Sequence, residues 1–256
     1  MSMKEKTFLK WSMALIFLIL MFQNAYADIY MKQKQHTDAV TMMGQTQPAK
    51  DVISESWITA DKIVMMTEKQ KVIMDMDKKT MTMVNHEQKV IANMPMDLSK
   101  SMGKMDRKED MSPEAKAQFQ QMMSQMMQIE VKVKETNERK KIGKWNCRKY
   151  LQTINMAMGT TNSEIWTTED IKVDEDLYIK YSVGILAQMP GMSQNMDAIA
   201  QELKKIKGVQ VYSEQTITMM GQAMKSTIEM IEFKEGKAPS DIFELPAEYK
   251  KTGAFR

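Results

Sequence analysis

Short runs of alternating apolar and polar residues dominate this chain of 256 residues. Alternation with a period of two puts every second side chain on the same face of an extended strand, so one face is buried and the other meets water. Polar turn residues separate the runs at short intervals, which is typical of antiparallel strands joined by hairpins. The pattern therefore predicts an antiparallel sheet as the main structural element.

The predicted strands form two groups along the chain. The first group comprises residues 50–59, 62–68, 71–76, 80–85 and 89–94, and the second comprises residues 129–136, 145–156, 161–167, 209–219 and 224–233. The short connections inside the first group indicate a meander of neighbouring strands. At the end of the second group, Gly221 and Gln222 are expected to close a hairpin, because glycine adopts the positive φ that tight hairpin turns need.

Methionine takes the place of leucine in the predicted core. The chain has 31 methionines, 27 of them after residue 27, where only six leucines occur. Methionine is unbranched and polarizable, so a core built from it is soft and adapts to irregular apolar partners. Methionines occupy alternate positions in three consecutive parts of the meander: Met74 and Met76, Met81 and Met83, and Met94 and Met96. A register that pairs these faces would form a continuous wall of thioethers.

Helices are predicted in the remaining chain. Residues 97–112 lack a regular apolar period and are expected to form a flexible connection. Ser112, Pro113 and Glu114 are then a typical helix start, and this predicted helix runs to about residue 128. One stripe of the helix is apolar and contains Phe119, Met122, Met123, Met126 and Met127. Two further helices are predicted over residues 174–188 and 194–205.

The first 27 residues have the features of a signal peptide. Three lysines precede an apolar run over residues 13–22, and Ala25-Tyr26-Ala27 is a small-x-small cleavage signal. Cleavage near Ala27 would leave Asp28 at the N-terminus, a position where a lipoprotein carries cysteine. No later run is apolar enough for a membrane-spanning helix. We therefore expect a periplasmic or secreted chain whose residues 28–256 form one domain.

The charge balance does not favour a nucleic-acid partner. The chain carries 36 basic and 33 acidic side chains, a net charge of +3 that is spread along the sequence. The densest basic stretch, residues 139–149, is either a phosphate-binding patch or the solvated face of a strand, and we favour the strand. Its Cys147 is the chain's only cysteine, so no disulfide forms within the chain. We expect this thiol to be buried rather than reactive.

The chain lacks the motifs of common catalytic sites. It contains no glycine-rich phosphate loop, no G-x-S-x-G sequence and no H-E-x-x-H sequence. Of its two histidines, His86 falls in a predicted hairpin turn and is expected at the surface. Asp75 and Asp77 lie on one face beside Lys78, as in an ordinary solvated turn. We therefore predict a protein that is not an enzyme and needs no cofactor.

Six segments of the chain resemble a family of uncharacterised bacterial exported proteins. These are residues 54–63 (SESWITADKI), 72–79 (VIMDMDKK), 84–89 (VNHEQK), 143–150 (GKWNCRKY), 164–168 (EIWTT) and 243–250 (FELPAEYK). The family is a domain of unknown function allied to the LolA/LolB-like lipoprotein-carrier superfamily. The resemblance implies an α+β, LolA-like fold, in which an antiparallel sheet curls into an incomplete β-barrel with helices packed on its concave side. In the lipoprotein carriers this concavity receives acyl chains.

Three hypotheses follow for function. The leading one is a nonenzymatic binding protein that holds a lipid, an acyl chain or another hydrophobic ligand in a Met-lined concavity. The candidate lining consists of Met74, Met76, Met81, Met83, Met94, Phe119, Met122, Met123, Met126 and Met127. One alternative is Cu(I) binding, because thioethers suit this soft cation. The other is an envelope or stress protein whose exposed methionines absorb oxidants.

Overall fold

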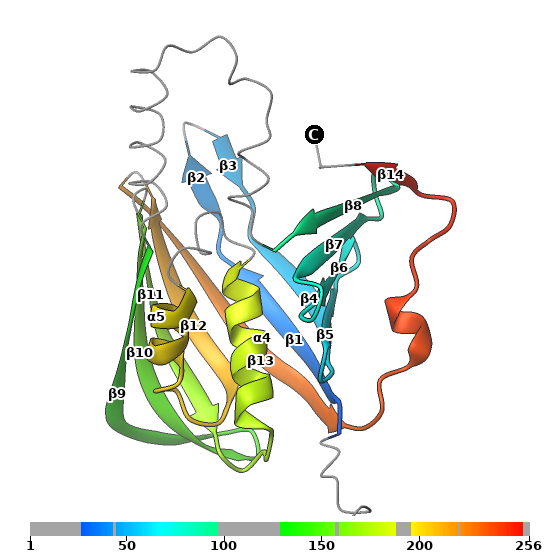
Figure 1. Cartoon of the computed structure of the whole chain (residues 1–256). Helices are drawn as coiled ribbons and strands as arrows, with labels where there is room; N and C mark the ends of the chain where they lie inside the picture. The colour runs from blue at the N-terminus through cyan, green and yellow to red at the C-terminus, as the bar shows by residue number, and fades with distance from the viewer. Residues whose placement is uncertain are drawn as a thin grey trace, which may run out of the picture.

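A computed structural model describes residues 27–42, 45–96, 129–156, 159–187, 196–219 and 221–252 of the chain. Within these residues the fold is mainly one large antiparallel sheet with two α-helices (Figure 1). The strands are β1 (Ile29–Thr37), β2 (Val40–Met42), β3 (Gln45–Gln47), β4 (Lys50–Ile58), β5 (Lys62–Met66), β6 (Gln70–Asp75), β7 (Thr80–Asn85), β8 (Val90–Pro95), β9 (Ile129–Ile142), β10 (Trp145–Met156), β11 (Gly159–Thr168), β12 (Val209–Met219), β13 (Gln222–Glu235) and β14 (Lys250–Thr252). The helices are α4 (Glu175–Ala187), α5 (Met196–Leu203) and the short 3-10 helix η2 (Ser240–Phe243).

Strand β1 joins two halves of the sheet. The strand order is β14-β8-β7-β6-β5-β4-β1-β13-β12-β11-β10-β9, and β2 and β3 form a separate hairpin. β1 pairs with β4 on one side and with β13 on the other. We call β4–β8 the first half and β9–β13 the second half. Every neighbouring pair in the large sheet is antiparallel except β14 with β8, which is parallel.

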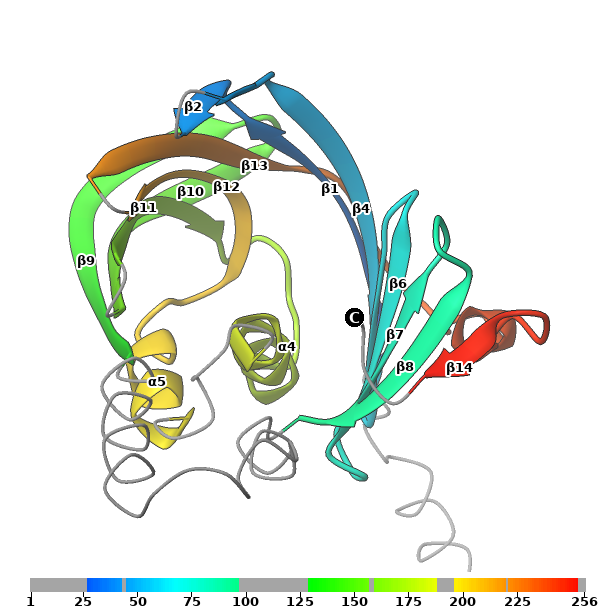
Figure 2. The same ribbon diagram turned by 90° about the horizontal axis from the view of Figure 1, so that it is seen from above.

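The sheet is curved and open (Figure 2). Its end strands, β14 and β9, do not pair with each other among the described residues. The register shifts in three strand pairs, at Lys32/Gln33 between β1 and β13, at Arg148/Tyr150 between β9 and β10, and at Trp166/Thr167 between β11 and β12. Such irregularities bend a strand and increase its local twist, so they contribute to the curvature.

The hairpins agree with the sequence prediction, whereas strand β9 is longer than predicted. β4–β8 form the predicted meander, and Gly221, with a φ of +77°, lies in the turn where Met219 pairs with Gln222. β9 continues to Ile142, beyond the predicted residue 136, because its last part pairs with the start of β10 although both of its faces are mostly exposed. Exposure of both faces removes the alternation of apolar and polar residues, so the sequence analysis placed the end of this strand too early.

α4 contacts both halves of the sheet. Asp174 precedes it, and the Asp174 Oδ1 accepts a hydrogen bond from the Leu177 backbone N at 2.9 Å. On the first half, a Cβ added to Gly184 would lie 3.3 Å from both Ile63 Cδ1 and Met74 Sδ. On the second half, the Tyr178 hydroxyl accepts a hydrogen bond from the Gln210 backbone N at 3.0 Å. None of the described helices is long and apolar enough to cross a membrane.

α5 lies beside the edge strand β9. The Glu202 Oε2 accepts a hydrogen bond from the Val133 backbone N at 2.9 Å, which satisfies a donor that an edge strand would otherwise leave unpaired. Both helices match the predicted ranges 174–188 and 194–205 to within a few residues. Three predicted segments lie outside the described residues. They are the signal peptide except for its last residue, Ala27, the flexible connection over residues 97–112, and the helix over residues 113–128.

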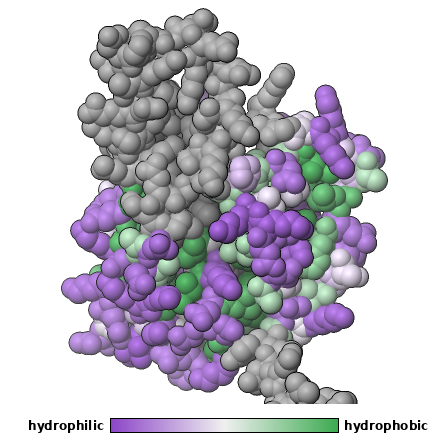
Figure 3. Space-filling view, viewed as in Figure 1, coloured by the Kyte–Doolittle hydropathy of each residue, from purple (hydrophilic) through white to green (hydrophobic). Residues whose placement is uncertain are grey.

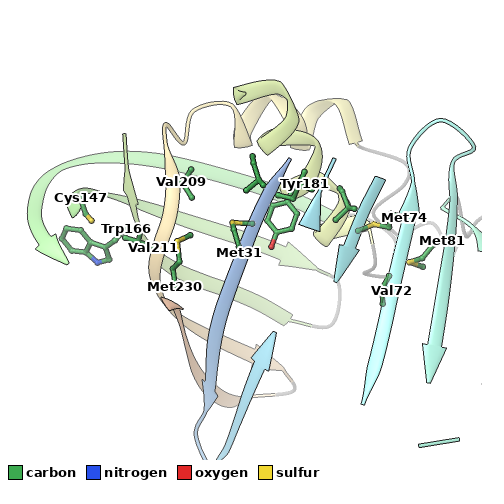
Figure 4. Close-up of a cluster of buried hydrophobic side chains, with 13 residues drawn as sticks. Met31, Val72, Met74, Met81, Cys147, Trp166, Tyr181, Val209, Val211 and Met230 are labelled. Atoms are coloured by element: carbon green, nitrogen blue, oxygen red, sulfur yellow. The ribbon is translucent and has the colours of Figure 1, made fainter. Parts of the chain in front are cut away.

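Two clusters of buried side chains form the core. The first contains Ile29, Met31, Ile58, Ile63, Val72, Met74, Met81, Cys147, Trp166, Tyr181, Val209, Val211 and Met230 (Figure 4). The second contains Ile129, Val131, Val133, Tyr150, Ile154, Ile165, Ile199 and Leu203. Tyr181 of α4 belongs to the first cluster and Ile199 of α5 to the second, so the two helices cover different parts of the sheet.

The C-terminal segment contacts the opposite face of the first half. The Lys71 Nζ donates a hydrogen bond to the Glu244 backbone oxygen at 2.9 Å, and His86 Nδ1 lies 3.1 Å from the Tyr249 hydroxyl. β14 then adds to the edge of β8. Because residues on this face such as Val64 and Val84 are buried, we infer that the C-terminal segment helps to cover them.

Candidate functional site

A cavity of about 420 Å³ lies between the two helices and the second half of the sheet. Its lining comes from β1 (Gln33, Gln35), β10 (Gln152, Ile154), β11 (Thr161, Ser163, Ile165), β12 (Gln210, Ser213, Gln215, Ile217), β13 (Ile228), α4 (Tyr178, Ile179, Tyr181, Ser182) and α5 with the turn after it (Leu203, Ile206). The volume falls in the range of sites that hold small ligands.

The lining combines apolar side chains with uncharged polar ones. Isoleucine, leucine and tyrosine supply apolar surface, while glutamine, serine and threonine supply amide and hydroxyl groups. Among the residues that the structure describes, none of those that line the cavity carries a charge. Such a surface accommodates hydrocarbon and offers hydrogen bonds to uncharged groups, but it provides no counter-ion.

Five polar residues, one from each of five neighbouring strands, line up across this half of the sheet. They are Thr37, Ser226, Gln215, Ser163 and Gln152, on β1, β13, β12, β11 and β10, and each is the register partner of the next. Directly paired residues in antiparallel strands have Cβ atoms about 4.5–5.5 Å apart. We call this row the polar stripe. Its members Gln215, Ser163 and Gln152 line the cavity.

Rows that contain isoleucines and short polar residues border the polar stripe on both sides. Strand parity places Ile228 and Ile165 on one side of it, and Ile217 and Ile154 on the other. All four isoleucines line the cavity. The stripe ends at β9, where Val133 pairs with Gln152. Ser213 lies between Ile228 and Ile165, and Thr161 lies between Ile217 and Ile154, so isoleucines alternate with hydroxyl-bearing residues in both bordering rows.

Ser226 is the unusual member of the polar stripe. Its side chain is only 3% exposed, and its Oγ is the one buried side-chain oxygen or nitrogen that has no hydrogen-bond partner among the described residues. Ser226 pairs with Gln215 and lies two residues from Ile228 on the same strand, so parity places it on the cavity face. Unsatisfied buried hydroxyls are rare and costly. Ser226 is not itself a lining residue of the cavity, but its register partner Gln215 is.

Two tyrosines of α4 complete the lining with hydroxyl groups that stay protonated. Burial raises the pKa of Tyr178, although its hydroxyl accepts a backbone hydrogen bond from Gln210. Burial also raises the pKa of Tyr181, whose hydroxyl hydrogen-bonds with Ser56 of β4. Both phenols are therefore neutral at physiological pH, and the site gains no negative charge from them.

The structure assembles the predicted methionine wall, but the wall does not line this cavity. Met74 pairs with Met81, and Met81 pairs with Met94, on the inner face of the first half. Met74 and Met81 are buried in the first core cluster, and Met76, Met83 and Met94 pack against it. Phe119, Met122, Met123, Met126 and Met127 lie outside the described residues. The proposal that these ten residues line a ligand site stays a prediction.

The polar stripe escaped the sequence analysis for a physical reason. Each stripe residue is a common strand residue, and none stands out within its own run. Only the register between strands that are far apart in sequence, such as Thr37 of β1 with Ser226 of β13, brings the five together. The available signal was the presence of serine and glutamine at core-facing positions of residues 145–156, 161–167 and 209–219.

Cys147 and the basic stretch have the structural roles that we predicted. The Cys147 thiol is 2% exposed, and burial raises its pKa, which suppresses the reactive thiolate. Around it, the basic side chains of β9 and β10 are paired with acidic ones: Arg139 and Arg148 with Glu135, Arg148 also with Glu169, and Lys149 with Glu138 and Glu164. Of the other basic side chains in this stretch, Lys140 lies over the Trp166 ring and Lys144 over the Trp145 ring.

The acidic and histidine side chains considered above lie in or beside turns of the first half of the sheet. The Lys78 backbone N and Nζ both donate to the Asp75 carboxylate at 2.9 Å, which lowers the pKa of Asp75 as in an ordinary turn. His86 lies in the turn after β7, partly exposed. Within the described ranges, no three histidine, cysteine, aspartate or glutamate side chains gather as a metal site.

On the molecular surface, large exposed apolar residues are scattered. They are Ile53, Leu151, Met219, Ile231 and Leu245. On the face seen in Figure 3, apolar patches lie between mainly polar residues. Single exposed apolar residues are normal, so the described surface argues for the cavity as the candidate site.

Solved structures that are similar to this chain include two bacterial proteins. A putative outer membrane lipoprotein-sorting protein domain from Vibrio parahaemolyticus has 7% sequence identity and a TM-score of 0.34, covering 86% of this chain and 91% of its own. A DUF1329 family protein from Desulfovibrio piger has 8% identity and a TM-score of 0.31, covering 88% of this chain and 92% of its own. No protein-family model and no curated protein matches the chain.

Proposed function

We propose that this chain is an exported, nonenzymatic binding protein that holds a hydrophobic ligand between its helices and the concave side of its sheet. The observation that carries the proposal is the uncharged cavity of about 420 Å³, lined by isoleucine, tyrosine, glutamine and serine. The signal-peptide features of the first 27 residues support a periplasmic or secreted location. Figure 2, in which α4 and α5 lie within the curve of the sheet, supports the placement of the helices.

In this proposal the methionine wall supports the cavity from the side. α4 lines the cavity through Tyr178 and Ser182 and rests on Met74 through Gly184. Thioethers adapt to altered contacts more easily than branched side chains do, so α4 is able to shift on them as a ligand enters. Five of the predicted lining residues then form a deformable support for α4, and they contact the ligand directly only when α4 moves. They are Met74, Met76, Met81, Met83 and Met94.

Native mass spectrometry tests the proposal on protein purified without detergent. We expect a bound species that organic extraction recovers as a hydrophobic compound. In Ser182→Trp, the larger side chain of α4 should occupy the cavity. The mass of the bound species is then expected to disappear from the spectrum. The matched control is Lys180→Trp, on the exposed side of the same helix, which should leave it unchanged. Repeated recovery of empty wild-type protein, together with no uptake of added lipid, would contradict the proposal.

A second candidate function is Cu(I) binding at the methionine wall. It is supported by the register that sets Met74, Met81 and Met94 side by side on three neighbouring strands, since thioethers are soft ligands. Anaerobic titration with Cu(I) against a competing chelator tests it, with Met81→Leu as the variant. An affinity that this substitution does not lower would remove the candidate.

A further inference from the structure

We propose that the cavity selects uncharged amphiphiles whose ester, amide or hydroxyl groups bond to the polar stripe, and that it discriminates against ligands that end in a carboxylate. This inference rests on the proposed function and names the ligand class of the same site. Two independent observations carry it: the absence of charge from the described part of the lining, and the hydroxyl of Ser226, which has no hydrogen-bond partner among the described residues.

The uncharged lining decides against an anionic ligand. A carboxylate that enters the cavity loses its hydration, and no lysine, arginine or histidine of the lining replaces it. An ion buried without a counter-charge is costly, whereas a neutral ester or hydroxyl needs only hydrogen bonds. The amides of Gln152 and Gln215 and the hydroxyl of Ser163 supply such bonds.

The polar stripe also decides against a purely apolar ligand. A hydrocarbon over the stripe would bury Gln152, Ser163 and Gln215 without replacing the hydrogen bonds that water gives them. A ligand with one polar group and one hydrocarbon chain matches the arrangement better. Its polar group lies on the stripe, and its chain lies against isoleucines of the bordering rows, such as Ile154 and Ile217.

Ser226 indicates where the polar group lies. Its hydroxyl is buried and without a hydrogen-bond partner among the described residues, and it pairs with Gln215 of the lining. The oxygen lies behind the cavity lining, so in our proposal a ligand carbonyl reaches the Ser226 hydroxyl when the neighbouring Gln215 side chain shifts. The arrangement therefore assigns the ligand's carbonyl or hydroxyl oxygen to the neighbourhood of Ser226 and Gln215.

Calorimetric titration of the delipidated full chain with monolaurin and with laurate tests the inference, because these probes share one acyl chain and differ in their polar end. We expect the wild-type protein to bind monolaurin at least about tenfold more tightly than laurate at neutral pH. Ser226→Ala should weaken monolaurin binding by about tenfold and leave laurate binding unchanged. Thr227→Ala, one residue along β13 and so on the opposite face, is the matched control and should change neither.

A second variant reverses the preference. Gln152→Lys places a cation at the partly exposed end of the polar stripe, and laurate is then expected to bind at least about tenfold more tightly than it binds the wild type. Laurate that binds the wild-type protein as tightly as monolaurin would overturn the inference and leave the proposed carrier function standing. Binding of neither probe would remove both.

Discussion

The inner-face side chains differ in type between the two halves of the sheet. In the first half, one inner row reads Met65, Val72, Met83 and Ala92 in successive register pairs. In the second half, the polar stripe carries serine and glutamine instead. Apolar side chains pack against α4 without cost, whereas short hydroxyls and amides fill less volume and need partners. The exchange of these residue types places the cavity in the second half.

Removal of the Ser226 hydroxyl is expected to stabilise the unliganded protein. The Oγ is buried without a partner, so Ser226→Ala removes an unsatisfied group and should raise the free energy of unfolding by about 1 kcal/mol. The matched control is Thr167→Val, because the Thr167 Oγ1 donates to the Lys207 backbone oxygen at 2.6 Å and this change should cost about 1 kcal/mol. Urea denaturation measures both. A loss of stability in Ser226→Ala would show that the hydroxyl is satisfied in the free protein.

Among the helices and strands, α4 decides how the two halves of the sheet are held relative to each other. Its Gly184 lies on Ile63 and Met74 of the first half, and its Tyr178 bonds to Gln210 of the second. Glycine lowers helix propensity by about 1 kcal/mol relative to alanine, so its presence within α4 needs a reason. The close approach of the helix to the methionine wall supplies that reason.

A larger side chain at position 184 is expected to lift α4 from the sheet. Gly184→Leu should lower the free energy of unfolding by about 1–3 kcal/mol, because its side chain would overlap Ile63 and Met74. Gly184→Ala should be close to neutral, since the gain in helix propensity offsets a 3.3 Å contact with flexible side-chain ends. Thermal denaturation of both variants, with Lys180→Leu as the exposed control, checks this. Equal stability of Gly184→Leu and wild type would contradict the packing of α4 described here.

The fold depends on pairings between distant parts of the chain. β1 pairs with β13, so Ile29, near the start of the described chain, lies opposite Glu235, which is far from it in sequence. Such contacts form only after long stretches of chain are ordered, which is typical of slowly folding β-rich proteins. The same assembly buries tyrosines from β1, α4 and β12 in a single cooperative structure.

These tyrosines predict a loss of stability at alkaline pH. Burial and nearby carboxylates raise the pKa of Tyr30 and of Tyr212 to about 12, and burial raises the pKa of Tyr178 and Tyr181. An unfolded tyrosine ionises near pH ~10, so above this pH the unfolded chain loses protons that the folded chain retains. Below about pH 10 these tyrosines therefore do not make the free energy of unfolding depend on pH. Above pH ~10 their contribution lowers the free energy of unfolding, and it continues to do so as the pH approaches 12.

Urea denaturation at a series of pH values, with phenolate absorbance recorded in parallel, measures this loss. Tyr30→Phe removes one contributing group and should reduce the fall in stability above about pH 10. Unchanged stability across this range would contradict the burial of the tyrosines.

Sequence periodicity determined the local elements of this protein. Alternation identified the meander of β4–β8 and the hairpin of β12 and β13, and helical periodicity identified α4 and α5. It also set Met74, Met76, Met81 and Met83 on common strand faces, because the direction of a side chain in a strand depends only on position along that strand. These features are local, so a single sequence contains them.

Tertiary structure alone decided where the cavity lies. The pairing of β1 with β4 and β13 aligned Thr37, Ser226 and the rest of the polar stripe, and it separated this stripe from the methionine wall. The register between distant strands results from the packing of the whole inner face, to which every strand contributes. Isolated runs contain the residue types of the site, but only the assembled sheet brings them to one place.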